Sequence, residues 1–279
     1  ALLLGNHDEE NPNELLIQTG GLSLHRAIEK KDYEAVNALI KLGTDVNAFS
    51  EEEDTLFKEM TPLGIAFYMF DEYSVKALLE AGADVNLKTT AENTALGEIL
   101  GYMKDNYFSF DKIPLIEKLL KLLVDNGLKI NDTVDSKENT AFIKACKSID
   151  ENNLSNGKTL AAVVAKFLLK ENCDVNLTNL DGQTALMFLC ASRDVESQDL
   201  QIQVLEAGAD IEATDKNGNT PLIYAAKNRN ASIGKEMAEL LFDFGDPKLG
   251  HVNNDGKTAL EIATDLNNEE FVKFLLIKM

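Results

Sequence analysis

Residues 5–10, with the sequence GNHDEE, contain side chains that can ligate a metal ion. An amide, an imidazole and adjacent carboxylates could serve a metal-dependent hydrolase, with His7 as the most specific ligand. No Asp-x-His pair accompanies this box elsewhere in the chain. Residues 215–219, DKNGN, have the oxygen donors of a calcium loop, but their Gly comes fourth rather than sixth. We therefore expect no bound metal and no cofactor, and keep the metal-dependent hydrolase as an alternative.

Nucleophilic catalysis has equally little support from the types and spacing of the residues. The chain contains no phosphate-cradling glycine loop and no zinc-ligand spacing. Its three cysteines, Cys146, Cys173 and Cys190, are odd in number and widely spaced, which argues against a disulfide framework. This favours a reducing compartment, so we expect a cytoplasmic protein. Because the chain begins with Ala1, a secreted or periplasmic location after removal of a signal peptide stays open.

The composition narrows the kinds of partner. The 279 residues carry 27 Lys and Arg against 47 Asp and Glu, a net charge of −20. Such a chain repels nucleic-acid phosphates and anionic membranes, and no apolar run is long enough to span a bilayer. The charge favours a protein partner with a basic surface, or else serves only to keep the protein dissolved.

Two phrases recur along the chain and predict internal repeats. The first is LLEAGADVN at 78–86, which returns as VLEAGADIE at 204–212 and, altered, as LLKENCDVN at 168–176. The second begins with Thr in six places, and a weaker copy, LSLHRAI, stands at 22–28. The six Thr copies are TPLGIAF (61–67), TALGEIL (94–100), TAFIKAC (140–146), TALMFLC (184–190), TPLIYAA (220–226) and TALEIAT (258–264). The sequence therefore predicts a protein of seven repeat units.

Local chemistry predicts two helices in each unit. Thr is a good helix N-cap, and Pro62 and Pro221 follow it at the first helical position, where a missing N–H costs nothing. The second helix should close in the left-handed conformation, which suits Gly and, next best, Asn172. The glycines expected to close it are Gly43, Gly82, Gly127, Gly208 and Gly245.

These motifs resemble the ankyrin repeat over about residues 20–279, after a lead segment at 1–19. The resemblance implies a mostly α solenoid of stacked helix-turn-helix units joined by β-hairpin-like fingers. The units fall at about 20–50, 56–88, 89–133, 135–178, 179–213, 215–252 and 253–279. The His of the family's Thr-Pro-Leu-His signature survives only as His25, and Glu92 and Glu138 replace the finger glycine of units three and four. We expect those two fingers to be looser.

Units three and four carry surplus residues. Thr94 to Gly127 spans 33 positions and Thr140 to Asn172 spans 32, against 21 from Thr61 to Gly82. The surplus, including smaller excesses in units five and six, should lie between the first and second helices. It predicts two neighbouring long loops, 101–112 and 147–158. The first holds Tyr102, Tyr107, Phe108 and Phe110, which either bind a partner or pack on their own repeats.

The resemblance also implies which residues bind. Partners of ankyrin repeats usually contact the finger tips and the ends of the first helices. Apolar candidates concentrate in units two and three, with polar ones in units four and six. The candidates outside the long loop are Phe57, Met60, Tyr68, Met69, Lys137, Lys216 and Asn217.

A non-catalytic protein-interaction module is therefore the leading hypothesis. In a solenoid, His25 and His251 lie about six repeats apart and cannot form a triad. Cys146 and Cys190 occupy a place that the family fills with buried Ala, which predicts core thiols. We expect a monomer, acting as a bacterial inhibitor or immunity protein or as a host-targeting effector. The other alternative is an accessory segment of a larger protein.

Overall fold

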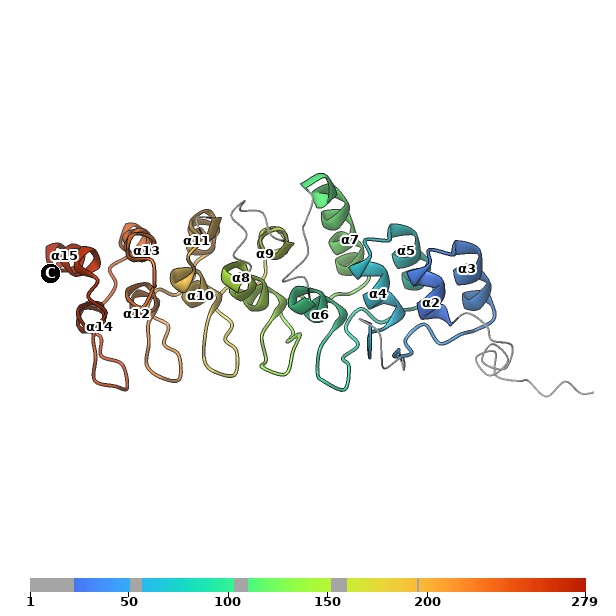
Figure 1. The fold of residues 1–279 in the computed structure, drawn as a ribbon, viewed down its shortest axis with the longest axis horizontal. Coiled ribbons are helices and arrows are strands. Elements are labelled where there is room, and N and C mark those ends of the chain that lie inside the picture. The colour runs from blue at the N-terminus through green and yellow to red at the C-terminus, as the bar shows by residue number, and fades with distance from the viewer. Residues whose placement is uncertain (1–22, 51–56, 103–109, 152–159, 195) are drawn as a thin grey trace, which may run out of the picture.

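Fourteen α-helices form two stacked rows along the described chain (Figure 1). The computed structural model describes residues 23–50, 57–102, 110–151, 160–194 and 196–279. The first helix of each unit lies in one row: α2 (Leu24–Glu29), α4 (Pro62–Tyr68), α6 (Ala95–Tyr102), α8 (Ala141–Glu151), α10 (Ala185–Ala191), α12 (Pro221–Ala226) and α14 (Ala259–Asp265). The second helices form the other row: α3 (Tyr33–Lys41), α5 (Glu72–Glu80), α7 (Ile113–Asp125), α9 (Leu160–Lys170), α11 (Glu196–Glu206), α13 (Ala231–Phe244) and α15 (Glu269–Lys278).

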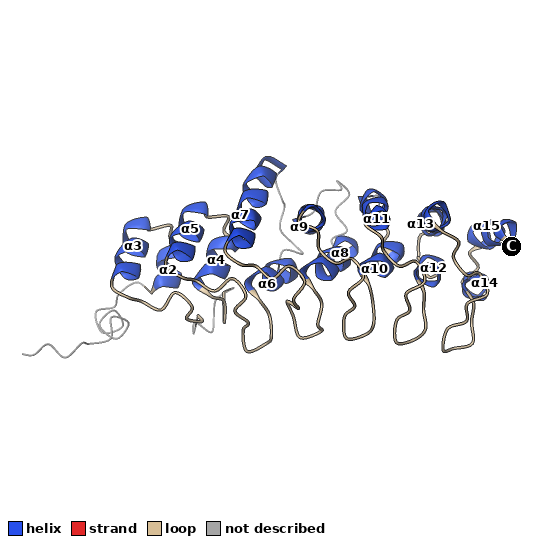
Figure 2. Ribbon diagram, turned by 180° about the vertical axis from the view of Figure 1, so that it is seen from behind, coloured by secondary structure: helices blue, strands red, loops and turns tan. Residues whose placement is uncertain are grey.

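The fingers project from the side of the first helices, away from the second helices (Figures 1 and 2). In the described residues they contain two isolated β-bridges, Lys88 to Thr94 and Thr133 to Thr140, and no extended strand. The predicted solenoid is confirmed. The predicted lead segment at 1–19 lies outside the described residues.

Threonine caps start the first helices as predicted. The hydroxyl of Thr61 accepts from the amide of Gly64 at 3.1 Å, and the hydroxyl of Thr94 accepts from the amide of Gly97 at the same distance. The Thr residues of units four to seven make equivalent bonds, while Ser23 caps α2 in the first unit. Each cap satisfies a helix N–H that would otherwise lack a partner.

Left-handed closures end the second helices of units one to five. Gly43, Gly82, Gly127 and Gly208 have φ between 83° and 90°, and Asn172 has φ of 59°. In unit two the amide of Ala83, the residue after Gly82, donates to Leu78 O at 2.9 Å. The prediction is confirmed for these five units.

Unit six closes differently, so the prediction for Gly245 is wrong. Its φ is −173°, which is extended backbone. The amide of Lys248 donates to Glu212 Oε1, in the same way that the amide of Asp84 donates to Asn47 Oδ1 in unit two. Lys248 is therefore the equivalent of Asp84. Pro247, one residue earlier, is the equivalent of Ala83. Proline has no N–H, and the closing bond cannot form. A Cβ on Gly245 would overlap Ile211 Cδ1, the far end of a side chain, which would have to shift.

The core runs through the whole stack, because the first helix of each unit packs on the first helices of its neighbours. Cys146 and Cys190 are fully buried in it, which confirms the predicted core thiols. Burial raises the pKa of both thiols, and it raises the pKa of the Cys173 thiol to about 12. All three therefore stay protonated at neutral pH and react slowly.

The surplus residues only partly form loops. In unit four, α8 continues to Glu151, so the predicted loop 147–158 begins as helix. In unit six, the surplus lengthens α13 to 14 residues against 9 in α5, and the prediction of an inter-helix loop is wrong there. Residues 103–109 and 152–159, which hold most of both predicted loops, lie outside the described residues.

Glutamate does not prevent the finger turns of units three and four. Glu92 and Glu138 have φ of 63° and 56°, the sign that Gly182 adopts in unit five. The amide of Glu138 donates to Asp135 O at 3.0 Å, as Gly182 does to Asn179 O at 2.9 Å. The unit-four finger is therefore not looser in its hydrogen bonding, and its glutamate carries the strain of a left-handed backbone.

Replacing Glu138 with Gly should relieve this strain. We expect Glu138→Gly to raise the free energy of unfolding by about 0.5 kcal/mol, since roughly 1 kcal/mol of strain is partly offset by greater freedom of the unfolded chain. Gly182→Ala is the reverse change at the equivalent position, and should cost about 1 kcal/mol or more. Its Cβ would also meet the amide nitrogen of Lys216 at 3.1 Å. Urea unfolding measures both, and a loss of stability in Glu138→Gly would contradict the assignment.

Candidate partner-binding face

The fingers of units four to seven share one hydrogen-bonded turn. In unit four, Asp135 Oδ1 accepts from the amides of Lys137 at 3.0 Å and of Asn139 at 3.1 Å. Asn179, Asp215 and Asn253 accept in the same way in the next three units. In unit three, Thr89 takes this place and its hydroxyl accepts from the amide of Asn93 alone, at 3.3 Å. The turn chemistry is thus more complete in units four to seven.

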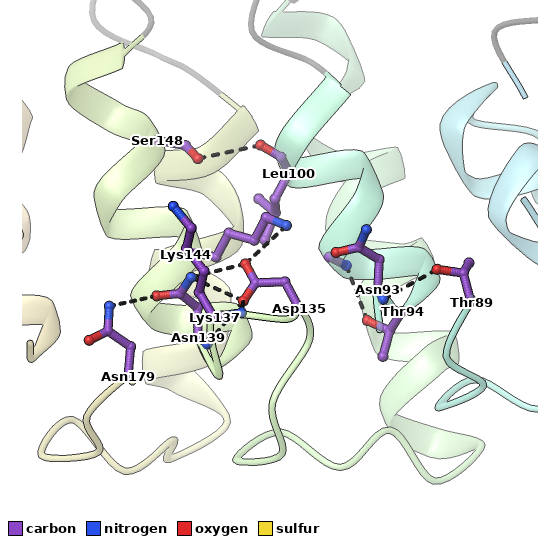
Figure 3. Close-up of polar contacts among 11 residues, drawn as sticks. Thr89, Asn93, Thr94, Leu100, Asp135, Lys137, Asn139, Lys144, Ser148 and Asn179 are labelled. Carbon is purple, nitrogen blue, oxygen red and sulfur yellow. Dashed lines mark hydrogen bonds and ion pairs between the residues drawn. The ribbon is translucent and has the colours of Figure 1, made fainter. Parts of the chain in front are cut away.

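Hydrogen bonds also join one finger to the next. The amide of Leu180 donates to Lys137 O at 2.9 Å, and the amide of Lys216 donates to Asp181 O at 2.8 Å. Side chains add a second link, because Asn179 Nδ2 donates to Asn139 Oδ1 at 3.0 Å (Figure 3). The fingers of units four to seven therefore form one connected row. The row fixes the backbone of the predicted binding residues Lys137, Lys216 and Asn217.

The first helices supply a wall beside this row. Lys144, Phe188 and Tyr224 each stand four residues after the capping Thr of their unit. Lys144 Nζ lies 3.2 Å from Asp135 Oδ2, and Tyr224 Oη donates to Asp215 Oδ2 at 2.8 Å. We call the surface made by the fingers and these helices the inner face. The three wall residues are not among the predicted contact residues, although their constant distance from the capping Thr would have indicated them.

A buried carboxyl group lies on α6, where this helix meets α8. Glu98 is 7% exposed, and burial raises the pKa of its carboxyl to about 7. The charge of Lys144 opposes this shift, while that of Glu59 adds to it. For Asp135, burial alone would raise the pKa, but hydrogen bonds from Asn139 and the charge of Lys144 outweigh burial and lower it. Asp135 therefore holds Lys144 as an ion pair beside Asn139 and Asn179 (Figure 3).

The apolar candidates of unit two are less accessible than predicted. Met60 is 1% exposed and belongs to the core, so its selection as a contact residue is corrected: the finger backbone turns its side chain inward. Phe57 and Tyr68 are half-buried and pack edge to face, with ring centroids 5.5 Å apart. Met69 is half-buried against the core as well.

The remaining candidates divide between the inner face and the undescribed parts of the chain. Lys137, Lys216 and Asn217 are exposed on the finger tips, where the prediction placed them. Tyr107 and Phe108 lie outside the described residues, as do the side chains of Tyr102 and Phe110. His7 and its GNHDEE box lie outside them too.

The described part of the chain contains neither a metal-binding group nor a membrane-spanning helix. There, no group of three or more His, Cys, Asp or Glu residues could hold a metal ion. The ring nitrogens of His25 and His251 hydrogen-bond to the carbonyls of Ala48 and Gly218 in separate units. No described helix has both the length and the apolar character needed to cross a bilayer.

The comparisons with known proteins agree on one family. Residues 160–230 and 195–279 match the family model for ankyrin repeats (3 copies). Similar proteins include a putative ankyrin repeat protein, L92, of Acanthamoeba polyphaga mimivirus, 28% identical over 56% of this chain and 43% of that protein. Another is tyrosine-protein kinase HTK16 of Hydra vulgaris, 30% identical over 62% of this chain and 23% of that protein. The chain thus spans less than half the length of either relative.

Solved structures extend the likeness to nearly the whole chain. The human ASB11 ankyrin repeat domain has a TM-score of 0.64 and 23% identity, covering 92% of this chain and 97% of that one. The ankyrin repeat domain of Bcl-3 has the same TM-score and 18% identity, covering 91% and 97%. At these identities the likeness shows the fold alone. Together with the family match over residues 160–279 and the stacked units, it shows that the chain has the ankyrin-repeat fold.

Proposed function

We propose that the chain is a non-catalytic module that binds a protein partner through its inner face, chiefly in units four to six. Ankyrin repeats indicate a protein-interaction role. The observation that carries the proposal for this face is the connected row of fingers, which holds exposed polar residues on a fixed backbone. Preorganised contacts lower the entropy cost of binding. The finer roles of bacterial inhibitor, immunity protein or host-targeting effector fall within this proposal.

A blocked finger tip should weaken binding. Because the native cysteines are buried, a new surface cysteine can be labelled selectively with a bulky polyethylene glycol maleimide. Asn217→Cys places the polymer on the unit-six finger, whereas Glu206→Cys places it on α11, in the row of second helices. Proteins captured from a lysate of the source organism are identified on the unlabelled protein and then tested on both conjugates.

We expect the Asn217→Cys conjugate to weaken binding of the captured protein by at least about 2 kcal/mol, since the polymer covers the centre of the interface. The Glu206→Cys conjugate should bind as the unlabelled protein does. Equal binding by both conjugates, or loss only on the α11 conjugate, would place the interface elsewhere.

A further inference from the structure

The lysines of the inner face differ from those of the second helices. On the second helices, several lysines pair with carboxylates: Lys76 Nζ lies within reach of Glu72, Lys166 Nζ is 2.7 Å from Asp199 Oδ2, and Lys170 Nζ is 3.4 Å from Glu117 Oε1. On the inner face of units four to six, four lysines pair with no carboxylate whose side chain the structure describes, a set that excludes Asp150 and Glu151 of α8. The four lysines are Lys137, Lys147, Lys216 and Lys227.

The nearby carboxylates are mostly committed to the fingers themselves. Asp135 and Asp215 are buried and accept from their own finger amides. Lys227 Nζ donates instead to Asn219 Oδ1 at 2.8 Å. Glu138 and Asp181 are the exposed carboxylates on these finger tips. With Lys144, these five lysines stand against the four carboxylates of Asp135, Glu138, Asp181 and Asp215, so this surface carries a local charge of about +1 on a chain whose net charge is −20.

Apolar groups lie among these lysines. Lys147 Nζ lies 5.5 Å from the centroid of the Phe188 ring, which is half-buried in the wall. Leu180, on the unit-five finger, is 42% exposed. A ligand that covers them would gain apolar contact between the charged positions.

We propose that the inner face of units four to six binds a short acidic segment of a partner protein. Its carboxylates pair with Lys147, Lys216 and Lys227, and an apolar side chain packs on Phe188 and Leu180. A segment is required rather than a wholly acidic protein, because the net charge of −20 repels a large anion at long range. This proposal rests on the proposed function and specifies its ligand.

Charge-matched variants and a defined probe test the proposal. The probe is a phage-displayed library of random peptides of about 12 residues, which reach about 40 Å when extended. Enriched peptides are synthesised and titrated against the wild-type protein and two triple variants. The inner-face variant carries Lys147→Gln, Lys216→Gln and Lys227→Gln. The control variant carries Lys76→Gln, Lys118→Gln and Lys170→Gln on the second helices, so both lose the same charge.

We expect Asp and Glu to be enriched in the selected peptides, with one apolar residue among them. The inner-face variant should bind about tenfold more weakly, since it loses three partly screened ion pairs, and the control variant less than about twofold more weakly. Raising NaCl from about 50 to about 300 mM should weaken binding to the wild type but change binding to the inner-face variant little.

Three outcomes would overturn the proposal. They are peptides without acidic residues, equal losses in both triple variants, and no enrichment of any peptide. If neutral peptides bind and the Asn217→Cys conjugate blocks them, the acidic ligand is wrong while the proposed function stands. If the peptides bind the Asn217→Cys conjugate as well as they bind the unlabelled protein, both the acidic ligand and the proposed binding face are wrong.

Discussion

The substitution Gly97→Ala is expected to lower the free energy of unfolding by about 3 kcal/mol, although Ala is the better helix former. A Cβ on Gly97 would overlap the carbonyl oxygen of Val134, which belongs to the finger of the next unit. That oxygen is backbone, and it also accepts from the amide of Thr94 at 3.1 Å. It cannot move without breaking the junction between units three and four.

Gly64→Ala is the matched control for this change. Gly64 and Gly97 both stand three residues after the capping Thr of their units. A Cβ on Gly64 would meet Met60 Cε and Thr61 Oγ1 at 3.4 Å, which is ordinary contact. We expect Gly64→Ala to be neutral or to stabilise the protein by up to about 1 kcal/mol. Urea unfolding measures both variants, and equal effects would show that the close approach to Val134 is not what requires glycine.

The second large effect is a dependence of stability on pH through Glu98. Its pKa is raised to about 7 in the folded protein because the carboxyl is buried, against an ordinary value of 4.5. A raised carboxyl pKa means that the folded state binds the proton more tightly than the unfolded state. The stability that this provides is fully present below pH 4.5 and is lost as pH rises through about 7.

Glu98→Gln should remove this dependence, since an amide mimics the protonated carboxyl. We expect the variant to exceed the wild type by about 2–3 kcal/mol at pH 8 and to match it near pH 4.5. Glu80→Gln, an exposed change in α5, should leave the pH profile unchanged. Parallel wild-type and Glu98→Gln profiles, measured by urea unfolding from pH 4.5 to 8.5, would contradict the burial of a protonated Glu98. Asp135 and Asp215, whose pKa values are lowered from 3.8, act below this range.

The sequence could predict features that depend on a few adjacent residues. The Thr caps and the closures at Gly82 and Asn172 follow from local backbone chemistry, so their spacing alone places the helices. The closure at Gly245 was mispredicted because Pro247, two residues on, removes the donor that closure needs. The prediction that extra residues lie in loops between the helices is also partly wrong, because extra residues can lengthen helices such as α8 and α13 as readily as they lengthen a loop.

The binding face was only partly predictable. Lys137, Lys216 and Asn217 were selected because finger tips are exposed in any such stack. Met60 was selected on the same ground, but its burial depends on how the unit-two finger turns. Whether a lysine has a carboxylate partner depends on contacts between units, so the difference between Lys216 and Lys170 could not be predicted from sequence. The burial of Glu98, on α6 where this helix meets α8, likewise depends on contacts between units.

Amide hydrogen exchange tests the central claim most directly, by comparing the protein alone with its complex with a captured partner. Binding through the inner face predicts slower exchange in the fingers at 179–183 and 215–219 and in the adjoining α10 and α12. The second helices α11 and α13 of the same units should exchange as they do in the free protein. Protection confined to α11 and α13, with the fingers unchanged, would contradict an inner-face binding site.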